Sequence, residues 1–262
     1  MNSLFVSPKE KHRKKIFRRL KLYALIIVII FLFWGIYYLF AELSIFKINS
    51  LEISGGEKLS KAQIMNEVTL EVLSGYRAKL LGLNNIFSWP NGSMQTNNQL
   101  LAGVLIEKDI LHRNIKVNVS ERRKYGAWCE MLTLNSSKCF WFDKDGIIFD
   151  SAPDTNGKLI FKINSKSLKT FSIGSGILEP SLFNNLKIVL ERLKNNFIVE
   201  DFNFNTESLD LETKIIDGPK LIFNLKFNPE TSLIALKEIN NKKIMGELKI
   251  IDLRIPNKIF YR

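Results

Sequence analysis

Residues 22–41 read LYALIIVIIFLFWGIYYLFA, a run of 20 residues without a charge. As an α-helix rising about 1.5 Å per residue, the run would span roughly 30 Å, the thickness of the hydrocarbon core of a bilayer. Tyr23 lies near one end, and Trp34, Tyr37 and Tyr38 lie toward the other, as aromatic side chains do at membrane interfaces. A buried helix of a soluble core is the alternative, but such a helix rarely lacks a polar face over this length. The run therefore predicts one transmembrane helix.

A cleaved signal peptide is a second alternative for this segment. The apolar part of a signal peptide is only about 7–15 residues long and is followed by small residues at the cleavage site. The run is longer than that, and residues 37–42, YYLFAE, lack the small-residue pattern. We therefore expect an uncleaved anchor.

The charges on the two sides of the run differ strongly. Residues 1–21 contain eight Lys or Arg and one Glu, whereas the nearby part of the other flank carries Glu42 and Lys47. Since basic flanks stay on the cytoplasmic side, we expect a cytoplasmic tail and an extracytoplasmic C-terminal part. The tail could instead bind nucleic acid or anionic lipid. Only Phe17 is interleaved with the basic residues to stack on bases, so we expect no nucleic-acid partner.

Length and composition limit what lies outside the membrane. The chain has 262 residues, 46% of them apolar, and a formal net charge of +12, much of which belongs to the tail. The remainder has room for one or two compact domains with sizeable cores. Two cysteines are too few for a disulfide scaffold, and their spacing fits no zinc motif.

The first exterior segment, residues 45–122, mixes helical and alternating patterns. Ser60 is a candidate N-cap and Gly75 a candidate helix end. Apolar residues between them recur every four positions and would share one helical face: Ile64, Val68 and Val72. The expected elements are a strand within 46–55, a helix over 60–75, a loop over 80–93, a short helix over 95–102, and strands over 104–110 and 115–120.

The second exterior segment, residues 123–262, changes to strands and turns. We expect a hairpin turn at 135–137 between two strands, and a tight turn at 143–146 into a third. The expected fold class is α+β, with strands over 127–133, 139–142, 147–149, 197–204, 209–214, 220–225, 246–253 and 258–261, and helices over 179–194 and 229–239.

Taken together, these features resemble the bacterial FtsQ family of cell-division proteins, called DivIB in Gram-positive bacteria. Short motifs carry the resemblance: FKINSLEISG at 46–55, IKVNVSER at 115–122 followed by Trp128, FDKDGIIF at 142–149, and DLR at 252–254. The family often has Pro where this chain has His112 and Lys124. The resemblance implies a basic tail over 1–21, a membrane helix over 22–41, a POTRA domain of β-α-α-β-β order over 45–122, and a mixed β domain with two helices over 123–262.

The resemblance also implies a function. It implies a non-enzymatic divisome scaffold in the cell membrane, at the division septum, that helps control septal peptidoglycan synthesis. Its implied partners are small single-pass proteins of FtsB/DivIC and FtsL type. Two alternatives stay open: a membrane-anchored POTRA protein of secretion or envelope assembly, and an anchored envelope enzyme.

A partner-binding site follows from the same resemblance. In the family, the FtsB-type partner adds a strand beside the last strands of the β domain, which correspond to residues 255–261 here. If this segment is one strand, its side chains alternate between two faces, and Pro256 weakens pairing because it lacks an N–H. The alternative is that the segment only closes the core. The candidate partner-binding residues are Ile255, Asn257, Lys258, Ile259, Phe260 and Tyr261.

Cys129 and Cys139 fall on opposite arms of the expected hairpin. If they face each other at a non-hydrogen-bonded pair, a disulfide is possible. Its small loop would contribute about 3 kcal/mol in the chain-entropy model. The alternative is two buried free thiols at packing positions. The exterior compartment permits oxidation, so both interpretations stay open.

Patterns of catalysis and metal binding are missing from the sequence. His112 is the one histidine beyond the anchor, and no G-x-S-x-G, H-E-x-x-H or P-loop motif occurs. Residues 143–146, DKDG, begin like a calcium loop but lack Gly at position 6 and Glu at position 12. We therefore assign His112 and residues 143–146 to turns, and expect no catalytic residue, metal, cofactor or small-molecule substrate.

Overall fold

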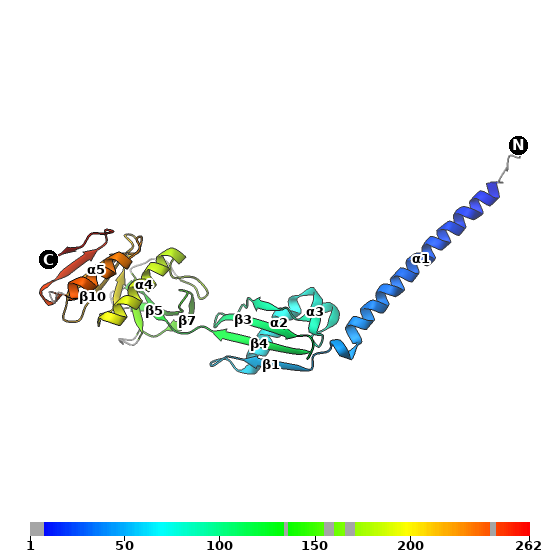
Figure 1. The fold of residues 1–262 in the computed structure, drawn as a ribbon, viewed down its shortest axis with the longest axis horizontal. Coiled ribbons are helices and arrows are strands. Elements are labelled where there is room, and N and C mark those ends of the chain that lie inside the picture. The colour runs from blue at the N-terminus through cyan, green and yellow to red at the C-terminus, as the bar shows by residue number, and fades with distance from the viewer. Residues whose placement is uncertain (1–7, 134–135, 155–159, 166–170, 242–244) are drawn as a thin grey trace. The chain divides into compact units, whose positions relative to one another are not determined.

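The computed structural model describes residues 8–133, 136–154, 160–165, 171–241 and 245–262. The chain divides into two compact units (Figure 1). The first consists of Met1–Thr96 with Gly103–Ser120, and the second of Asn97–Ala102 with Glu121–Arg262.

The N-terminal helix α1 (Pro8–Glu42) is continuous, so the basic residues from Lys9 onward belong to the same helix as the apolar run. Its portion Phe17–Glu42 is long and apolar enough to cross a membrane, and none of its most apolar window is buried inside the protein. The apolar helix expected from the sequence is therefore present. Residues 1–7 of the expected tail lie outside the described residues.

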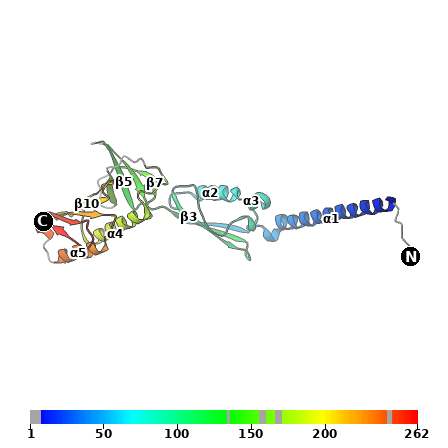
Figure 2. The same cartoon turned by 90° about the horizontal axis from the view of Figure 1, so that it is seen from above.

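The rest of the first unit is a four-stranded sheet with helices on one face (Figure 2). The strand order is β1-β4-β3-β2, with β1 parallel to β4 and β2 antiparallel to β3. Its elements are η1 (Ser44–Phe46), β1 (Ser50–Ser54), α2 (Lys61–Ser74), α3 (Tyr76–Leu81), η2 (Ile86–Ser88), β2 (Gly92–Met94), β3 (Leu101–Asp109) and β4 (Asn114–Glu121).

Helix α2 forms where its local signals place it. The Ser60 hydroxyl accepts from the Gln63 N–H at 3.2 Å, and the Gln63 side chain accepts from the Ser60 N–H at 2.9 Å, a reciprocal capping box. The expected apolar face is confirmed, and Gly75 caps the C-terminus. The buried residues of that face are Ile64, Val68 and Val72.

Two expectations for the first unit are wrong. The second helix is α3, which begins directly after Gly75, and residues 95–102 form a turn followed by the start of β3. Asn98 explains the turn, because its side chain accepts from the Leu100 N–H at 3.0 Å and its carbonyl from the Leu101 N–H at 3.1 Å. The expected loop over 80–93 contains the end of α3, all of η2 and the start of β2.

The second unit is a nine-stranded mixed sheet in the order β13-β12-β11-β10-β9-β8-β5-β6-β7. Two helices cover one face, where they bury a large apolar core (Figures 1 and 2). The elements are β5 (Gly126–Thr133), β6 (Ser136–Phe142), β7 (Ile148–Ala152), β8 (Phe161–Ser165), α4 (Pro180–Asn196), β9 (Phe202–Phe204), β10 (Asp210–Lys214), β11 (Lys220–Asn224), α5 (Glu230–Asn241), η3 (Met245–Glu247), β12 (Ile250–Leu253) and β13 (Phe260–Tyr261).

The sequence predicts most of these elements but not all. It assigns no element to β8, which joins the two halves of the sheet by pairing parallel with both β5 and β9. The expected strand over 246–253 is shorter, because η3 occupies its first residues. Of the expected hairpin turn at 135–137, residue 135 lies outside the described residues and β6 starts at Ser136.

The turn at 143–146 uses its acidic residue to bind the backbone. The Asp143 carboxylate accepts from the N–H groups of Asp145 and Ile147 at 3.0 and 2.9 Å, and it also accepts from the Arg122 guanidinium. Gly146 has φ +76°, and a Cβ there would lie 2.8 Å from the Phe183 ring. Asp143 therefore closes the turn and ties it to Arg122, the residue that follows β4.

Candidate functional site

The end of the chain, residues 254–262, forms a turn and a short edge strand. Residues 255–257 form the turn, with Asn257 at φ +60° and the Lys258 N–H donating to the Ile255 carbonyl at 3.2 Å. Only Phe260–Tyr261 forms a strand. The expected side-chain alternation over all of 255–261 is therefore wrong. The physical reason is local, since Pro256 lacks an N–H for a ladder and Asn257 readily adopts the left-handed region.

Hydrogen bonds define which way the backbone of β13 points. Ile250 and Arg262 exchange both of their hydrogen bonds, each at 3.2 Å, so they form a hydrogen-bonded pair. Such pairs alternate with non-hydrogen-bonded pairs along an antiparallel ladder. The next pair, Ile251 with Tyr261, is therefore non-hydrogen-bonded. The N–H and C=O of Tyr261 consequently point away from β12, toward the outer side of the sheet.

This outer side is open in the part of the chain that the structure describes. β13 is the last strand of the sheet order and pairs only with β12. The opposite edge, β7, differs. There the Ile148 N–H donates to the Ser175 carbonyl at 2.9 Å, and the Gly174 N–H donates to the Ile148 carbonyl at 2.7 Å. The loop at 174–176 thus covers the start of the β7 edge, whereas no described residue pairs with the outer side of β13, which can accept another strand.

Three apolar side chains next to this edge remain exposed. Ile255, Phe260 and Tyr261 have exposed fractions of 48%, 54% and 57%. Asn257 and Lys258 are also exposed, whereas Ile259 is half-buried and packs against the core of the unit. The candidate residues therefore divide, with Ile259 acting as an internal anchor and the others available to a partner.

An ion-pair group holds the turn beside β13. The Arg254 guanidinium donates to both carboxylate oxygens of Asp252, at 2.6 and 2.9 Å, and to Asp210 at 3.3 Å. The hydrogen bonds from Arg254 lower the pKa of Asp252. These contacts connect the end of β12 to β10, so the residues before the edge strand have a fixed position.

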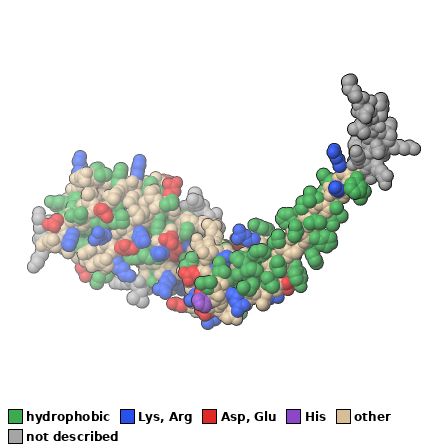
Figure 3. All heavy atoms as spheres, turned by 45° about the vertical axis from the view of Figure 1, so that its right-hand side comes forward, with side chains coloured by type: hydrophobic (Ala, Val, Ile, Leu, Met, Phe, Trp, Pro, Cys, Tyr) green, Lys and Arg blue, Asp and Glu red, His purple; other side chains and the backbone are tan. Residues whose placement is uncertain are grey.

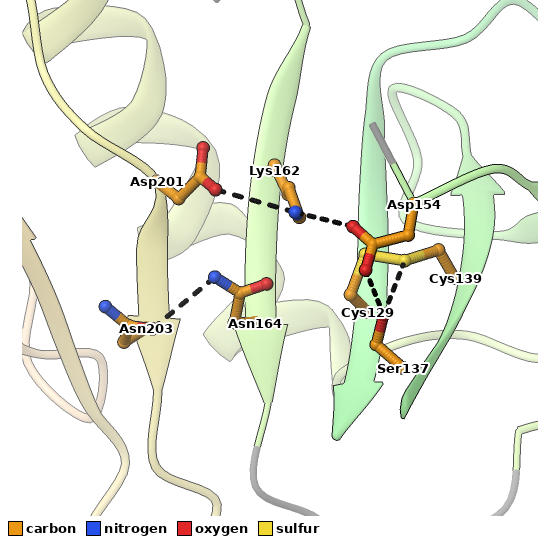
Figure 4. The surroundings of a disulfide bond; sticks show 8 residues. All are labelled: Cys129, Ser137, Cys139, Asp154, Lys162, Asn164, Asp201 and Asn203. Atoms are coloured by element: carbon orange, nitrogen blue, oxygen red, sulfur yellow. Dashed lines mark hydrogen bonds and ion pairs between the residues drawn. A yellow bond between two sulfur atoms is a disulfide. The ribbon is translucent and has the colours of Figure 1, made fainter. Parts of the chain in front are cut away.

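Cys129 and Cys139 form a disulfide bond (Figure 4). They lie directly opposite each other on β5 and β6, and the bond is buried. Ser137, which lies 3.9 Å from the Cys139 sulfur, donates to Asp154, and Asp154 accepts from Lys162 at 2.7 Å. The hydrogen bond from Lys162 is the main reason that the pKa of Asp154 is lowered.

The two sulfurs and the Asp154 carboxylate lie close enough together to suggest metal ligands. A metal binds the thiolate form of cysteine, and the disulfide removes both thiolates. The Asp154 oxygens are moreover bonded to Ser137 and Lys162. We therefore interpret the group as a disulfide with a polar cover rather than as a metal centre.

Glu130 is a buried acidic residue that belongs to none of the sequence motifs. Its exposed fraction is 3%, and its Oε1 atom has no hydrogen-bond partner among the described residues. Burial raises the pKa of Glu130, while Lys138 opposite it and the Phe171 N–H act in the other direction. The burial of Glu130 could be predicted from the sequence, because residues two apart in a strand face the same side. If Trp128 points toward the core, Glu130 does so as well.

His112 lies in the exposed turn between β3 and β4. The Nδ1 atom of the His112 ring is 2.6 Å from the Asp109 carboxylate. The backbone N–H of His112 donates to the same carboxylate at 3.1 Å. The pair thus closes the turn that connects the two strands, as the sequence predicts for a structural histidine.

Comparisons with known proteins add no assignment. No protein-family model matches the chain, and no curated protein matches its sequence significantly.

Proposed function

We propose that this protein is a non-enzymatic scaffold of bacterial cell division, of the FtsQ/DivIB type. It would cross the cell membrane once through α1, with its N-terminus in the cytoplasm and both folded units outside. The apolar portion Phe17–Glu42 and the basic residues before it support this topology.

The order of elements in the first unit supports the family assignment. β1, α2, α3, β3 and β4 follow the β-α-α-β-β order of a POTRA domain, with the short strand β2 inserted before β3. The second unit would be the β domain, since its mixed sheet carries two helices on one face. This proposal places the boundary between the two domains near Glu121.

The observation that carries the proposed role is the open edge at β13. An extended segment of a partner can hydrogen-bond to the outward N–H and C=O of Tyr261, and its side chains can pack on Ile255 and Phe260. Partners of FtsB/DivIC and FtsL type would be captured in this way. The protein would recruit them to the septum and so help control septal peptidoglycan synthesis.

Localisation in dividing cells tests the proposal. A fluorescent protein fused to the cytoplasmic N-terminus should form a band at midcell, and depletion of the chain should disperse an FtsB-type partner from that band. A uniform membrane signal through the whole cell cycle would contradict the division role. That outcome would favour a POTRA protein of secretion or envelope assembly.

A further inference from the structure

The chain that leaves α1 is held by the loop after α3. The Asn85 side-chain amide donates to the Phe40 carbonyl at 2.6 Å, and the Ile48 N–H donates to the Asn84 carbonyl at 2.7 Å. The last four carbonyls of a helix lack partners within the helix. Asn85, which is buried, therefore caps the end of α1 from a different part of the chain.

Side chains of α1 itself also contact this region. The Tyr37 hydroxyl, which belongs to the apolar run, donates to the carbonyl of Leu80 at 2.9 Å. The ring of Phe40 stacks on Phe46 with 5.1 Å between centroids, and Phe87 lies 5.3 Å from Phe46 and 6.2 Å from Phe40. The end of α3 is therefore at the level of residues that lie within the span.

The turn between β3 and β4 lies against the same linker. The Arg113 guanidinium donates to the Ser44 carbonyl at 3.0 Å, and the Asn49 N–H donates to the Arg113 carbonyl at 2.8 Å. Two elements distant in sequence, α3 and this turn, thus flank the point at which the helix ends.

Both flanking elements expose large apolar side chains. Their exposed fractions are 68% for Tyr76, 56% for Leu80, 54% for Ile110 and 90% for Leu111. We name these four residues the collar. Apolar side chains of α1 continue onto the adjoining part of the first unit in the surface view (Figure 3). In water such exposure is unfavourable, which indicates that another apolar phase covers the collar.

We propose that the collar binds the extracytoplasmic surface of the bilayer, with its apolar side chains in the headgroup region around the exit of α1. This inference rests on the membrane span of the proposed function. The occupant is lipid rather than a protein, because Tyr37 of the span bonds to Leu80 directly, so a bilayer around α1 reaches α3. Arg77 and Lys79 on α3 add positive charge suited to lipid phosphates.

A depth measurement on the full chain tests the proposal. The native cysteines form a disulfide, so a single added cysteine can carry an environment-sensitive fluorophore. The labelled variants are Leu80→Cys and Leu111→Cys in the collar, Phe33→Cys within the span, and Ala62→Cys. Ala62 is the matched control, because it is exposed and lies at the start of α2, at the opposite end of that helix from α3.

Each variant is reconstituted in vesicles of phosphatidylcholine and phosphatidylglycerol that contain a lipid-borne quencher. A helix face at the interface sits about 5–10 Å into the boundary, so labels at Leu80 and Leu111 should be quenched at least about twofold more than at Ala62. Strong quenching at Phe33, with Leu80 and Leu111 quenched no more than Ala62, would overturn the collar alone. Absence of quenching at Phe33 would overturn the span, and the collar with it.

Discussion

Tyr261→Pro is the sharpest test of partner capture at the open edge. Proline removes the N–H of residue 261, which points away from β12 and has no role in the ladder within the sheet. The Tyr261 side chain is 57% exposed, so its loss leaves the core intact. Ile259→Pro is a less clean test, since Ile259 packs against the core.

The expected effect follows from one lost hydrogen bond. A net contribution of about 0.5–1.5 kcal/mol per bond corresponds to a Kd that is about 2- to 12-fold higher. The proline ring also keeps a partner strand at a distance, so the upper end of this range or beyond is expected. Tyr261→Ala is the matched control, because it removes the same side chain but keeps the outward N–H.

The assay adds the purified full chain, in detergent, to a fluorescent peptide from an FtsB-type partner. Fluorescence anisotropy of the peptide then gives the Kd. Circular dichroism and the midpoint of urea unfolding establish that both variants stay folded. Tyr261→Pro should bind at least several-fold more weakly than Tyr261→Ala. If both variants bind equally, with the fold intact, the partner does not hydrogen-bond to residue 261 and the proposed strand addition is refuted.

Three further predictions concern topology, the disulfide and pH. A C-terminal alkaline phosphatase fusion should be active and a C-terminal green fluorescent protein fusion dark; the reverse result would contradict the topology. Non-reduced peptide mapping should join Cys129 to Cys139 within one chain, and replacing both with Ala should lower the free energy of unfolding by about 3 kcal/mol, measured in urea. Because the folded pKa of Glu130 is raised, its carboxyl favours folding at low pH and this contribution is lost as pH rises above the ordinary glutamate value. Glu130→Gln should therefore match the parent in acid and be more stable at neutral pH, and an equal difference at both pH values would refute this explanation.

Elements with strong local signals could be predicted from the sequence. Helix α2 has a capping box, a four-residue apolar repeat and a terminal glycine, and each acts over a few neighbouring residues. The hairpin of β5 and β6 follows from two strand-like segments on either side of a short turn, and its register places Cys129 opposite Cys139. Local signals suffice here because the energetically decisive contacts are close in sequence.

Elements that depend on distant contacts could not be predicted in this way. α3 follows Gly75 without a loop, and its position is stabilised by Tyr37, 43 residues from its bonding partner Leu80. The alternation of residues 255–261 resembles a strand, but the left-handed Asn257 ends that pattern. No periodicity in the sequence indicates the position of α3, because that position depends on tertiary contacts. Nor does periodicity indicate the break at Asn257, because the break depends on one backbone angle.

The proposed partner-binding edge shows most clearly that sequence patterns do not reveal features that depend on distant contacts. β7 and β13 both end the sheet, and their own residues do not indicate which of the two is available. The difference arises from residues 174–176, which return to hydrogen-bond with Ile148 and cover the start of the β7 edge. Those bonds join residues more than 25 positions apart. The β13 edge, which no described residue covers, results from the pairing order of the whole sheet. A local segment of sequence can therefore indicate a strand, but the strand order of the folded sheet determines whether that strand can pair with a partner.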